Sequence, residues 1–270
     1  MNLSDAIKEA AEGDKLSLDA AGKIAREFDL SLMDVEKAAL STGVWPLRFT
    51  RHEGLITPEQ QIRLMSSRVV VAGCGGIGGY VSTFLARLGI GHLVLVDPDR
   101  FRESNLNRQL FCSVTNLGRY KAEVAAEVLS TINPASRLEP VVKRLEDSLD
   151  SFRASDLCLD CLDSRESRRV LSATCQDIKI PLVYAAVSGT CVQVAVEMPG
   201  KRIFERLYPP GSRPHVDDGL AGIFSFTTGA AAAFQAAQAL NLLLPRVPDI
   251  NFRGIFLDIR GPELESMEFF

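Results

Sequence analysis

The 270-residue chain has little of several features that would decide its function at once. It has no excess of basic residues, since 30 lysines and arginines stand against 34 aspartates and glutamates, and this balance speaks against a nucleic-acid groove. Its first residues lack the charged start and the apolar core of a signal peptide. Its longest apolar stretch, residues 229–244, contains side-chain amides and is too short to span a bilayer. We therefore expect a cytoplasmic protein that binds neither DNA nor a membrane.

Cysteine is scarce in the patterns that would hold a metal or a disulfide framework. The six cysteines are scattered, mostly in apolar strand-like runs, as expected in a reducing cytoplasm. Cys158 and Cys161 form the only C-x-x-C, which is half of a tetrahedral zinc site, and no second pair accompanies them. We therefore expect no zinc and interpret these two cysteines as packing residues of a buried strand.

What the sequence does contain is a glycine-rich turn between a strand and a helix. The run VVVAGCGGIGG, residues 69–79, is β-branched and ends in glycines, and an amphipathic segment follows at once. Gly73, Gly75 and Gly76 allow the backbone to approach a phosphate at the helix N-terminus, where free N–H groups and the helix dipole favour anions. A second strand ends in Asp97, about 20 residues further on, where nucleotide folds place a carboxylate on the ribose. The sequence therefore predicts a nucleotide site here.

The chain divides into a short helical unit, residues 1–45, and an α/β unit, residues 46–270. Ser17 and Ser31 precede helix-like patterns in the first unit as candidate N-caps. Strands and helices alternate in the second unit, which predicts a Rossmann-like, mainly parallel sheet. The expected strands are 68–72, 92–97, 138–142, 156–161, 182–186 and 191–198, the expected helices are 77–88, 118–132, 165–177 and 228–244, and the last strand and residues 254–269 are expected as antiparallel additions.

A second set of polar residues indicates which kind of nucleotide is bound. The run SNLNRQ, residues 104–109, follows the second strand, Lys121 opens the next helix, and Asp163 follows the fourth strand. Ligands of an open α/β sheet lie outside the carboxyl ends of its strands, so we expect these segments to meet. Two cations, Arg108 and Lys121, would clamp a triphosphate, and the Asp163 carboxylate would hold a divalent metal that bridges its oxygens.

Several ordered motifs of the chain together resemble the ThiF/MoeB/HesA family, which groups bacterial relatives of the ubiquitin-activating enzymes. They are GCGGIGG, VDPD, SNLNRQ, GxxK and DCLDS, with RFTRHEG upstream, and they extend over roughly residues 48–258. The resemblance implies a sheet of the ubiquitin-activating-enzyme type. It also implies an adenylyltransferase that uses ATP and Mg²⁺ to adenylate the C-terminal glycine of a ubiquitin-like sulfur carrier protein. The carrier would be ThiS-like or MoaD-like and end in Gly-Gly, and the chemistry would serve thiamine, molybdopterin or similar sulfur biosynthesis.

By matched position, the resemblance also implies roles for individual residues. The three turn glycines approach the phosphates, and Asp97 binds the ribose hydroxyls. Asn105, Arg108 and Lys121 contact the phosphates, and Asp163 positions Mg²⁺ and ATP.

Arg51, in the R-x-x-R segment before the first strand, would act in trans by reaching the nucleotide of the partner subunit in a homodimer. The catalytic set would then be Arg51, Arg108, Lys121 and Asp163. The chemistry of the residues agrees with this assignment, because the incoming carboxylate is already an anion and requires no general base. Catalysis then depends on positioning and on charge neutralisation as pyrophosphate leaves.

The chain departs from the family pattern in two places. Many members hold zinc through two C-x-x-C pairs around a loop that crosses over the carrier tail, but the matching residues 206–219 contain no cysteine. This absence favours adenylation alone over a thioester or persulfide on this chain. Ser164 replaces a common asparagine, and the same Asp-Ser pair occurs in the tRNA threonylcarbamoyladenosine dehydratase branch, so a dehydratase of that kind is an alternative. Ser164 could also act as the N-cap of the next helix.

Other classes of protein explain less of the sequence. An NAD(P)-binding oxidoreductase shares the glycine turn but leaves the two cations and the later carboxylate without a role. A nucleotide-sensing subunit would bind ATP without pyrophosphate exchange. Residues 21–37 have the apolar spacing of a helix-turn-helix, but Asp34 and Glu36 in the second helix would repel DNA phosphates. We therefore favour the adenylyltransferase.

Overall fold

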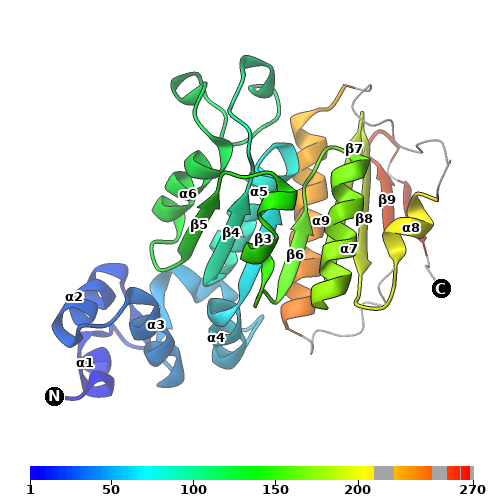
Figure 1. The fold of residues 1–270 in the computed structure, drawn as a ribbon. Coiled ribbons are helices and arrows are strands. Elements are labelled where there is room, and N and C mark those ends of the chain that lie inside the picture. Colours follow the sequence, from blue (N-terminus) through cyan, green and yellow to red (C-terminus); the bar gives the residue numbers. More distant parts are fainter. Residues whose placement is uncertain (210–221, 245–253, 262, 268–270) are drawn as a thin grey trace.

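An eight-stranded sheet forms the centre of the computed structural model, which describes residues 1–209, 222–244, 254–261 and 263–267 (Figure 1). The strand order is β10-β9-β8-β7-β6-β3-β4-β5, in which β7 to β5 are parallel and β8 to β10 are antiparallel. The mainly parallel α/β fold is therefore confirmed. The strands are β3 (Arg68–Ala72), β4 (His92–Val96), β5 (Arg137–Val141), β6 (Leu157–Asp160), β7 (Leu182–Ser188), β8 (Cys191–Glu197), β9 (Gly254–Asp258) and β10 (Glu263–Met267).

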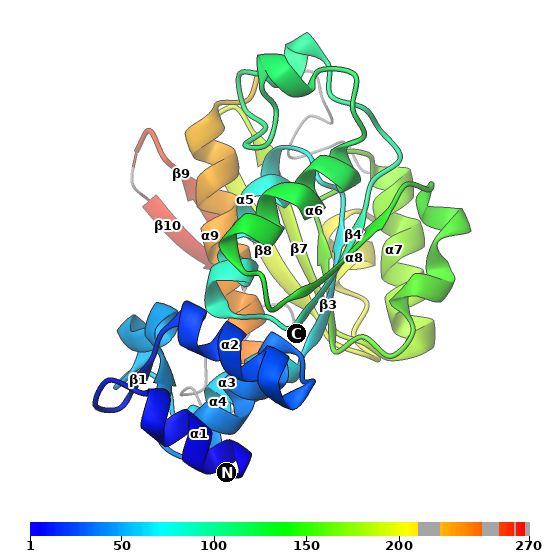
Figure 2. The same cartoon turned by 90° about the vertical axis from the view of Figure 1, so that its left-hand side faces the viewer.

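Helices cover both faces of this sheet, as the turned view in Figure 2 shows for α7 and α9. Residues of β3 alternate between the faces, so Val69 and Val71 pack with α5, α6 and α9, while Val70 packs with α7. Burial on both sides explains why the parallel strands are continuous apolar runs rather than alternating ones. The main helices are α5 (Gly76–Leu88), α6 (Lys121–Ile132), α7 (Arg165–Ile178) and α9 (Ser225–Leu243), with a short α8 (Ile203–Leu207).

Each predicted strand and helix of the α/β unit is present, with small differences at the ends. Helix α6 begins at Lys121 rather than at residue 118, because Gly118 has a φ of +82° that a right-handed helix cannot contain. Helix α9 begins earlier than expected, at Ser225. The predicted antiparallel additions are β8, β9 and β10, and residues 268 and 269 lie outside the described part.

The N-terminal segment packs its helices around an apolar cluster of its own. The predicted caps are confirmed, since Ser17 Oγ accepts from the Ala20 N–H at 3.2 Å and Ser31 Oγ accepts from the Asp34 N–H at 3.1 Å. The division of the chain at residue 45 stays a prediction. The elements are α1 (Leu3–Ala10), β1 (Lys15–Leu16), α2 (Leu18–Phe28), α3 (Leu32–Ser41) and β2 (Trp45–Pro46).

A 3₁₀ turn and a capped helix connect this segment to the sheet. They are η1 (Leu47–His52) and α4 (Pro58–Ser66), and α4 begins with a capping box formed by Thr57 and Gln60. The other short turns are η2 (Glu103–Asn105), η3 (Val114–Asn116), η4 (Leu145–Asp147) and η5 (Leu149–Phe152). Among the helices of the described ranges, none is both long and apolar enough to cross a lipid bilayer.

The turn from β3 into α5 brings backbone directly against backbone. Gly73 has a φ of +98°, and a Cβ atom there would lie 2.6 Å from the carbonyl oxygen of Cys161. A Cβ atom on Gly78 would lie 1.8 Å from the carbonyl oxygen of Gly73. Any side chain at these two positions would therefore push α5 away from the end of the sheet.

We expect Gly78→Ala to lower the free energy of unfolding by about 3 kcal/mol or more, because the new methyl group has no space beside a backbone carbonyl. Urea unfolding followed by circular dichroism measures the change. Gly22→Ala in α2 is the matched control, since a Cβ there meets only the Arg26 guanidinium at 3.7 Å. The control should gain about 0.5–1 kcal/mol from helix propensity. A Gly78→Ala protein as stable as the wild type would contradict the packing argument.

Candidate functional site

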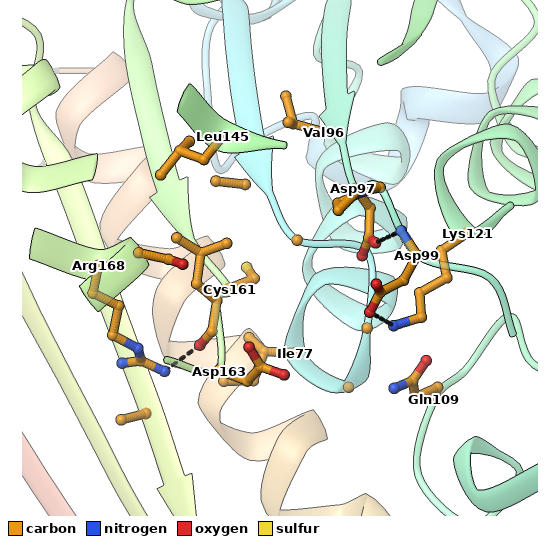
Figure 3. Close-up of a pocket in the computed structure, with 18 of the residues that line it drawn as sticks. Ile77, Val96, Asp97, Asp99, Gln109, Lys121, Leu145, Cys161, Asp163 and Arg168 are labelled. Atoms are coloured by element: carbon orange, nitrogen blue, oxygen red, sulfur yellow. Dashed lines mark hydrogen bonds and ion pairs between the residues drawn. The ribbon is translucent and has the colours of Figure 1, made fainter. Parts of the chain in front are cut away.

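A cavity of about 620 Å³ opens at the carboxyl ends of the parallel strands (Figure 3). It is bounded by the glycine turn, the ends of β4 and β6, the loop before α6, and the first turns of α6 and α7. Among the predicted site residues, those that line it are Gly73, Gly75, Gly76, Asp97, Arg108, Lys121 and Asp163. Segments far apart in the sequence therefore meet here, whereas Asn105 and Arg51 do not line the cavity.

The N-terminus of α5 faces this cavity without a side-chain cap. Gly75 occupies the N-cap position, and among the described residues no side chain caps the first turn. The free N–H groups of that turn, together with the helix dipole, make it suitable for an anion. The backbone at Gly75 and Gly76 can approach such an anion closely because neither residue has a side chain.

Asp97 ties the glycine turn to the end of β4. One carboxylate oxygen accepts from the Cys74 N–H at 2.7 Å, and the other accepts from the Asp99 N–H at 2.8 Å. Burial raises the pKa of Asp97, although the Lys121 charge and these two N–H groups oppose the rise. Each oxygen keeps a second lone pair, so a ribose hydroxyl can still donate to it. The ribose role of Asp97 stays a prediction.

Lys121 is held inside the cavity by an acid that the sequence analysis did not assign. Its Nζ lies 2.9 Å from Asp99 Oδ2, and its N–H donates to the Asp99 carbonyl oxygen at 2.9 Å (Figure 3). The lysine is 7% exposed, whereas the Asp99 side chain is 62% exposed. The signal for Asp99 was present in VDPD, in which two acids stand two residues apart at the end of a strand.

The loop after β4 carries Arg108 into the cavity and is shaped by Asn105. The Asn105 carbonyl oxygen accepts from the N–H groups of Arg108 at 3.2 Å and Gln109 at 3.0 Å, and its side-chain oxygen accepts from the Arg102 N–H at 3.0 Å. Asn105 is buried and stabilises the conformation of this loop by these hydrogen bonds. Its predicted contact with a phosphate stays a prediction. Gln109, also unassigned by the sequence analysis, lines the cavity beside Gly75.

Asp163 enters the cavity from the end of β6. Its side chain is exposed and makes no hydrogen bond or ion pair with other described residues. Ser164 next to it caps α7, accepting from the Ser167 N–H at 3.2 Å, as the sequence predicts. Arg168, which the sequence analysis missed, donates to the carbonyl oxygens of Ala185 and Leu162 and so fastens this loop to β7.

Within the described ranges, no three histidine, cysteine or acidic side chains lie close enough to hold a metal by themselves. Mg²⁺ commonly uses one or two carboxylates and completes its shell with water and substrate phosphates, so the unpaired Asp163 carboxylate fits that ion.

Cys158 and Cys161 are buried in and beside β6, and burial raises the pKa of both thiols well above the usual value. Cys161 donates to the side-chain oxygen of Gln235. Residues 210–219 of the expected crossover segment lie outside the described part.

A cavity at the carboxyl ends of parallel strands, beside a glycine-rich helix N-terminus, is typical of nucleotide-binding α/β proteins. Residues 49–270 match the sequence model of the ThiF family. The chain belongs to that family, as its motifs indicated.

Several characterised relatives cover most of the chain. The SAMP-activating enzyme E1 of Haloferax volcanii is 34% identical over 82% of this chain and 84% of its own length. The sulfur carrier protein ThiS adenylyltransferase of Escherichia coli is 31% identical over 70% of this chain and 76% of its own. The molybdopterin-synthase adenylyltransferase of Salmonella typhimurium is 35% identical over 68% and 76%. This chain is an adenylyltransferase of the same family.

A solved structure supports the fold independently. The crystal structure of Escherichia coli MccB with succinimide superimposes with a TM-score of 0.69 and covers 86% of this chain and 82% of that chain. The sequences are only 21% identical, so this likeness concerns the fold alone.

Asp160, the first acid of DCLDS, is fully buried at the end of β6 beside the cavity. One carboxylate oxygen accepts from the Leu162 N–H at 3.0 Å, and the other has no hydrogen-bond partner within the described part of the chain. Burial raises the pKa of Asp160 to about 6, and the positive charge of Arg168 opposes that rise.

This raised pKa predicts a pH-dependent stability. The folded state holds the Asp160 proton more tightly than the unfolded state, so the contribution of Asp160 to stability falls as pH rises from about 4 to about 6, by ~3 kcal/mol. Asp160→Asn cannot ionise, and its stability relative to the wild type should increase by that amount between pH 4 and pH 7 in urea titrations. Asp150→Asn, which alters an exposed carboxylate, is the control and should leave the pH dependence unchanged. If the free energies of unfolding of Asp160→Asn and the wild type changed in parallel with pH, the prediction would be contradicted, because ionisation of Asp160 would then not destabilise the fold.

Proposed function

We propose that this protein adenylates the C-terminal glycine of a ubiquitin-like sulfur carrier protein with ATP and releases pyrophosphate. The observation that carries the proposal is the meeting, in one cavity, of the α5 N-terminus, the cations Arg108 and Lys121, and the Asp163 carboxylate, which has no partner among the described residues. The names of the relatives support the acceptor, because they include a ThiS adenylyltransferase and a SAMP-activating enzyme. The carrier would be ThiS-like or MoaD-like with a C-terminal Gly-Gly.

In this proposal, each group of cavity residues binds a different part of the nucleotide. The N–H groups of the α5 turn hold the phosphates, while Arg108 and Lys121 offset the negative charge that develops as pyrophosphate leaves. Asp97 holds the ribose, and Asn105 keeps the Arg108 loop in place. Mg²⁺, when bound through Asp163, adds positive charge to the phosphate oxygens. No side chain needs to act as a base, because the carrier carboxylate is already ionised.

The ion pair between Lys121 and Asp99 has a role in this scheme. Without ligand, Asp99 balances the buried ammonium group, so Lys121 remains ordered inside the cavity. A triphosphate brings more negative charge than one carboxylate and competes for the same ammonium group. The exposed Asp99 can then turn to solvent at little cost.

Dimerisation is part of the proposal, with Arg51 acting in trans. Arg51 is exposed on η1, outside the cavity of its own chain. An apolar groove of about 370 Å³ runs beside it, lined by His52 of η1 and by side chains of α5 and α9 such as Phe84 and Leu240. A second copy of the chain that covered this groove would lie against η1, which is what a trans role of Arg51 requires.

The tRNA dehydratase alternative gains no support from Ser164. The serine caps α7, and asparagine serves equally well at an N-cap, so the Asp-Ser pair has a local structural reason.

The direct test of the proposal uses purified protein with ATP, Mg²⁺ and candidate carriers ending in Gly-Gly. We expect carrier-dependent ATP–pyrophosphate exchange and an acyl-adenylate detected by mass spectrometry of the carrier. A carrier lacking its last glycine is the control and should give neither signal. ATP binding without exchange for every intact carrier would overturn the proposal and favour a nucleotide-sensing subunit.

Substitutions of the cations test the roles of the cavity. Arg108→Ala and Lys121→Ala should each lower exchange about 100-fold or more, equivalent to ~3 kcal/mol of lost charge stabilisation. Arg119→Ala is a matched control, because Arg119 pairs with Glu127 on the surface and lines no part of the cavity. It should keep the wild-type rate. Unimpaired exchange in either cavity variant would refute the role of that residue.

A further inference from the structure

Arg48 makes polar contacts between the N-terminal helices and the α/β unit, which also share an apolar cluster that includes Leu40 of α3 and Met65 of α4. Arg48 donates from Nε to Glu36 Oε1 at 3.0 Å and from Nη2 to Glu36 Oε2, so the guanidinium grips the carboxylate with two bonds. Its remaining nitrogen, Nη1, donates to Asn133 Oδ1 at the end of α6. Asn133 in turn donates to the Ala86 carbonyl oxygen of α5 at 3.1 Å. Arg48 therefore joins α3 to the helices beside the cavity.

The contact between Arg48 and Glu36 is largely buried. Glu36 is 1% exposed, and the Arg48 side chain is 18% exposed. Burial raises the pKa of Glu36, while the Arg48 charge opposes the rise. In the part of the chain that the structure describes, Glu36 forms an ion pair with Arg48 alone, so its buried charge depends on that arginine.

Phe49 and His52 hold η1 by further contacts, and the centroid of the Phe49 ring also lies 4.4 Å from the Arg48 guanidinium. Phe49 is buried and stacks on His52 with ring centroids 5.6 Å apart. The His52 ring is 2.8 Å from the Gln61 side-chain oxygen, and Gln61 donates to the Leu88 carbonyl oxygen at 3.0 Å. The backbone of η1 is thus fixed between α3 on one side and α4 and α5 on the other.

A 3₁₀ turn aligns residues three positions apart, so Phe49 and His52 share one face and Arg48 and Arg51 share another. Arg51 is exposed and makes no hydrogen bond or ion pair with any other described residue. Its backbone is therefore fixed while its side chain is available to a ligand outside this chain.

We propose that Glu36 is a positioning residue, which directs Arg51 into the nucleotide site of the partner subunit by holding Arg48. This inference rests on the proposed function, in which Arg51 acts in trans. If Glu36 loses its charge, Arg48 loses its ion pair with α3, and among the described residues its guanidinium keeps only Asn133 and the Phe49 ring as contacts. The positive charge of Arg48 is then no longer balanced beside that of Arg51. Residues 49–270 are the range that matches the family, so Glu36 and Arg48 are contributed by the chain outside that range.

The test uses mixed dimers of the full chain and ATP as the probe. Two copies with different affinity tags are co-expressed, and dimers carrying both tags are isolated by two successive affinity steps. Lys121→Ala subunits have a defective cavity but an intact Arg51. Glu36→Gln subunits have an intact cavity but, on this proposal, a misdirected Arg51. Isothermal titration with ATP and Mg²⁺ then measures the affinity and number of sites.

We expect Glu36→Gln homodimers to bind ATP about tenfold more weakly than the wild type, because one charge-assisted contact is displaced. The mixed dimer of a Glu36→Gln subunit and a Lys121→Ala subunit should regain one site of wild-type affinity. In that dimer, the intact cavity of the Glu36→Gln subunit receives Arg51 from the Lys121→Ala subunit. Arg51→Ala mixed with Lys121→Ala should give the same result. Glu27→Gln, which alters an exposed acid of α2, is the control and should retain two wild-type sites.

The outcomes distinguish this inference from the proposed function. Absence of ATP binding by the wild type overturns both, and failure of Arg51→Ala to complement Lys121→Ala overturns the trans arrangement and the role of Glu36 with it. Complementation by Arg51→Ala but not by Glu36→Gln overturns the Glu36 role alone, as does wild-type affinity in Glu36→Gln homodimers. If Glu36→Gln does not fold, Arg48→Lys serves instead, because it keeps the charge but loses the two-bond grip.

Discussion

The rest of the site depends on the contact between two backbones at the start of α5. Gly78 and Gly73 touch with no room for a side chain, and Gly73 meets the end of β6 in the same way. This contact directs the free N–H groups of α5 into the space above the sheet. It also brings the Cys74 N–H within 2.7 Å of Asp97, so the ends of β3, β4 and β6 form one wall. This backbone geometry is suited to an anion at the strand ends before any charged side chain is considered.

Two of the charged side chains around this wall, Asp97 and Lys121, have partners within the chain. Asp97 is satisfied by two backbone N–H groups, and Lys121 is satisfied by Asp99. Asp163 is the carboxylate of the predicted site that has no partner among the described residues, and it is also exposed. A buried lysine without Asp99 would be disfavoured by desolvation, so a second acid after β4 is needed to keep the cation in place.

The sequence predicted the sheet well because its signals are local. Apolar runs, a glycine turn and caps such as Ser17 and Ser164 fix elements without reference to distant residues. It predicted which strand ends line the cavity, because ligands of open α/β sheets lie at carboxyl ends. It did not identify Arg168, whose acceptors are carbonyl groups of Ala185 and Leu162 and leave no pattern in the side chains.

Glu36 shows most clearly that the periodicity of apolar residues is not sufficient to predict which side chains are buried. The sequence analysis cited it as an acid of a second helix that would repel DNA phosphates, but it is buried against Arg48. A charge on a helix is usually assigned to solvent because burial without a partner is unfavourable, and here the partner lies beyond the end of the helix. The same pairing gives the N-terminal helices a physical connection to η1. Because η1 also carries Arg51, a rigid η1 limits the directions in which that side chain can extend, and a site completed by two subunits requires that restriction.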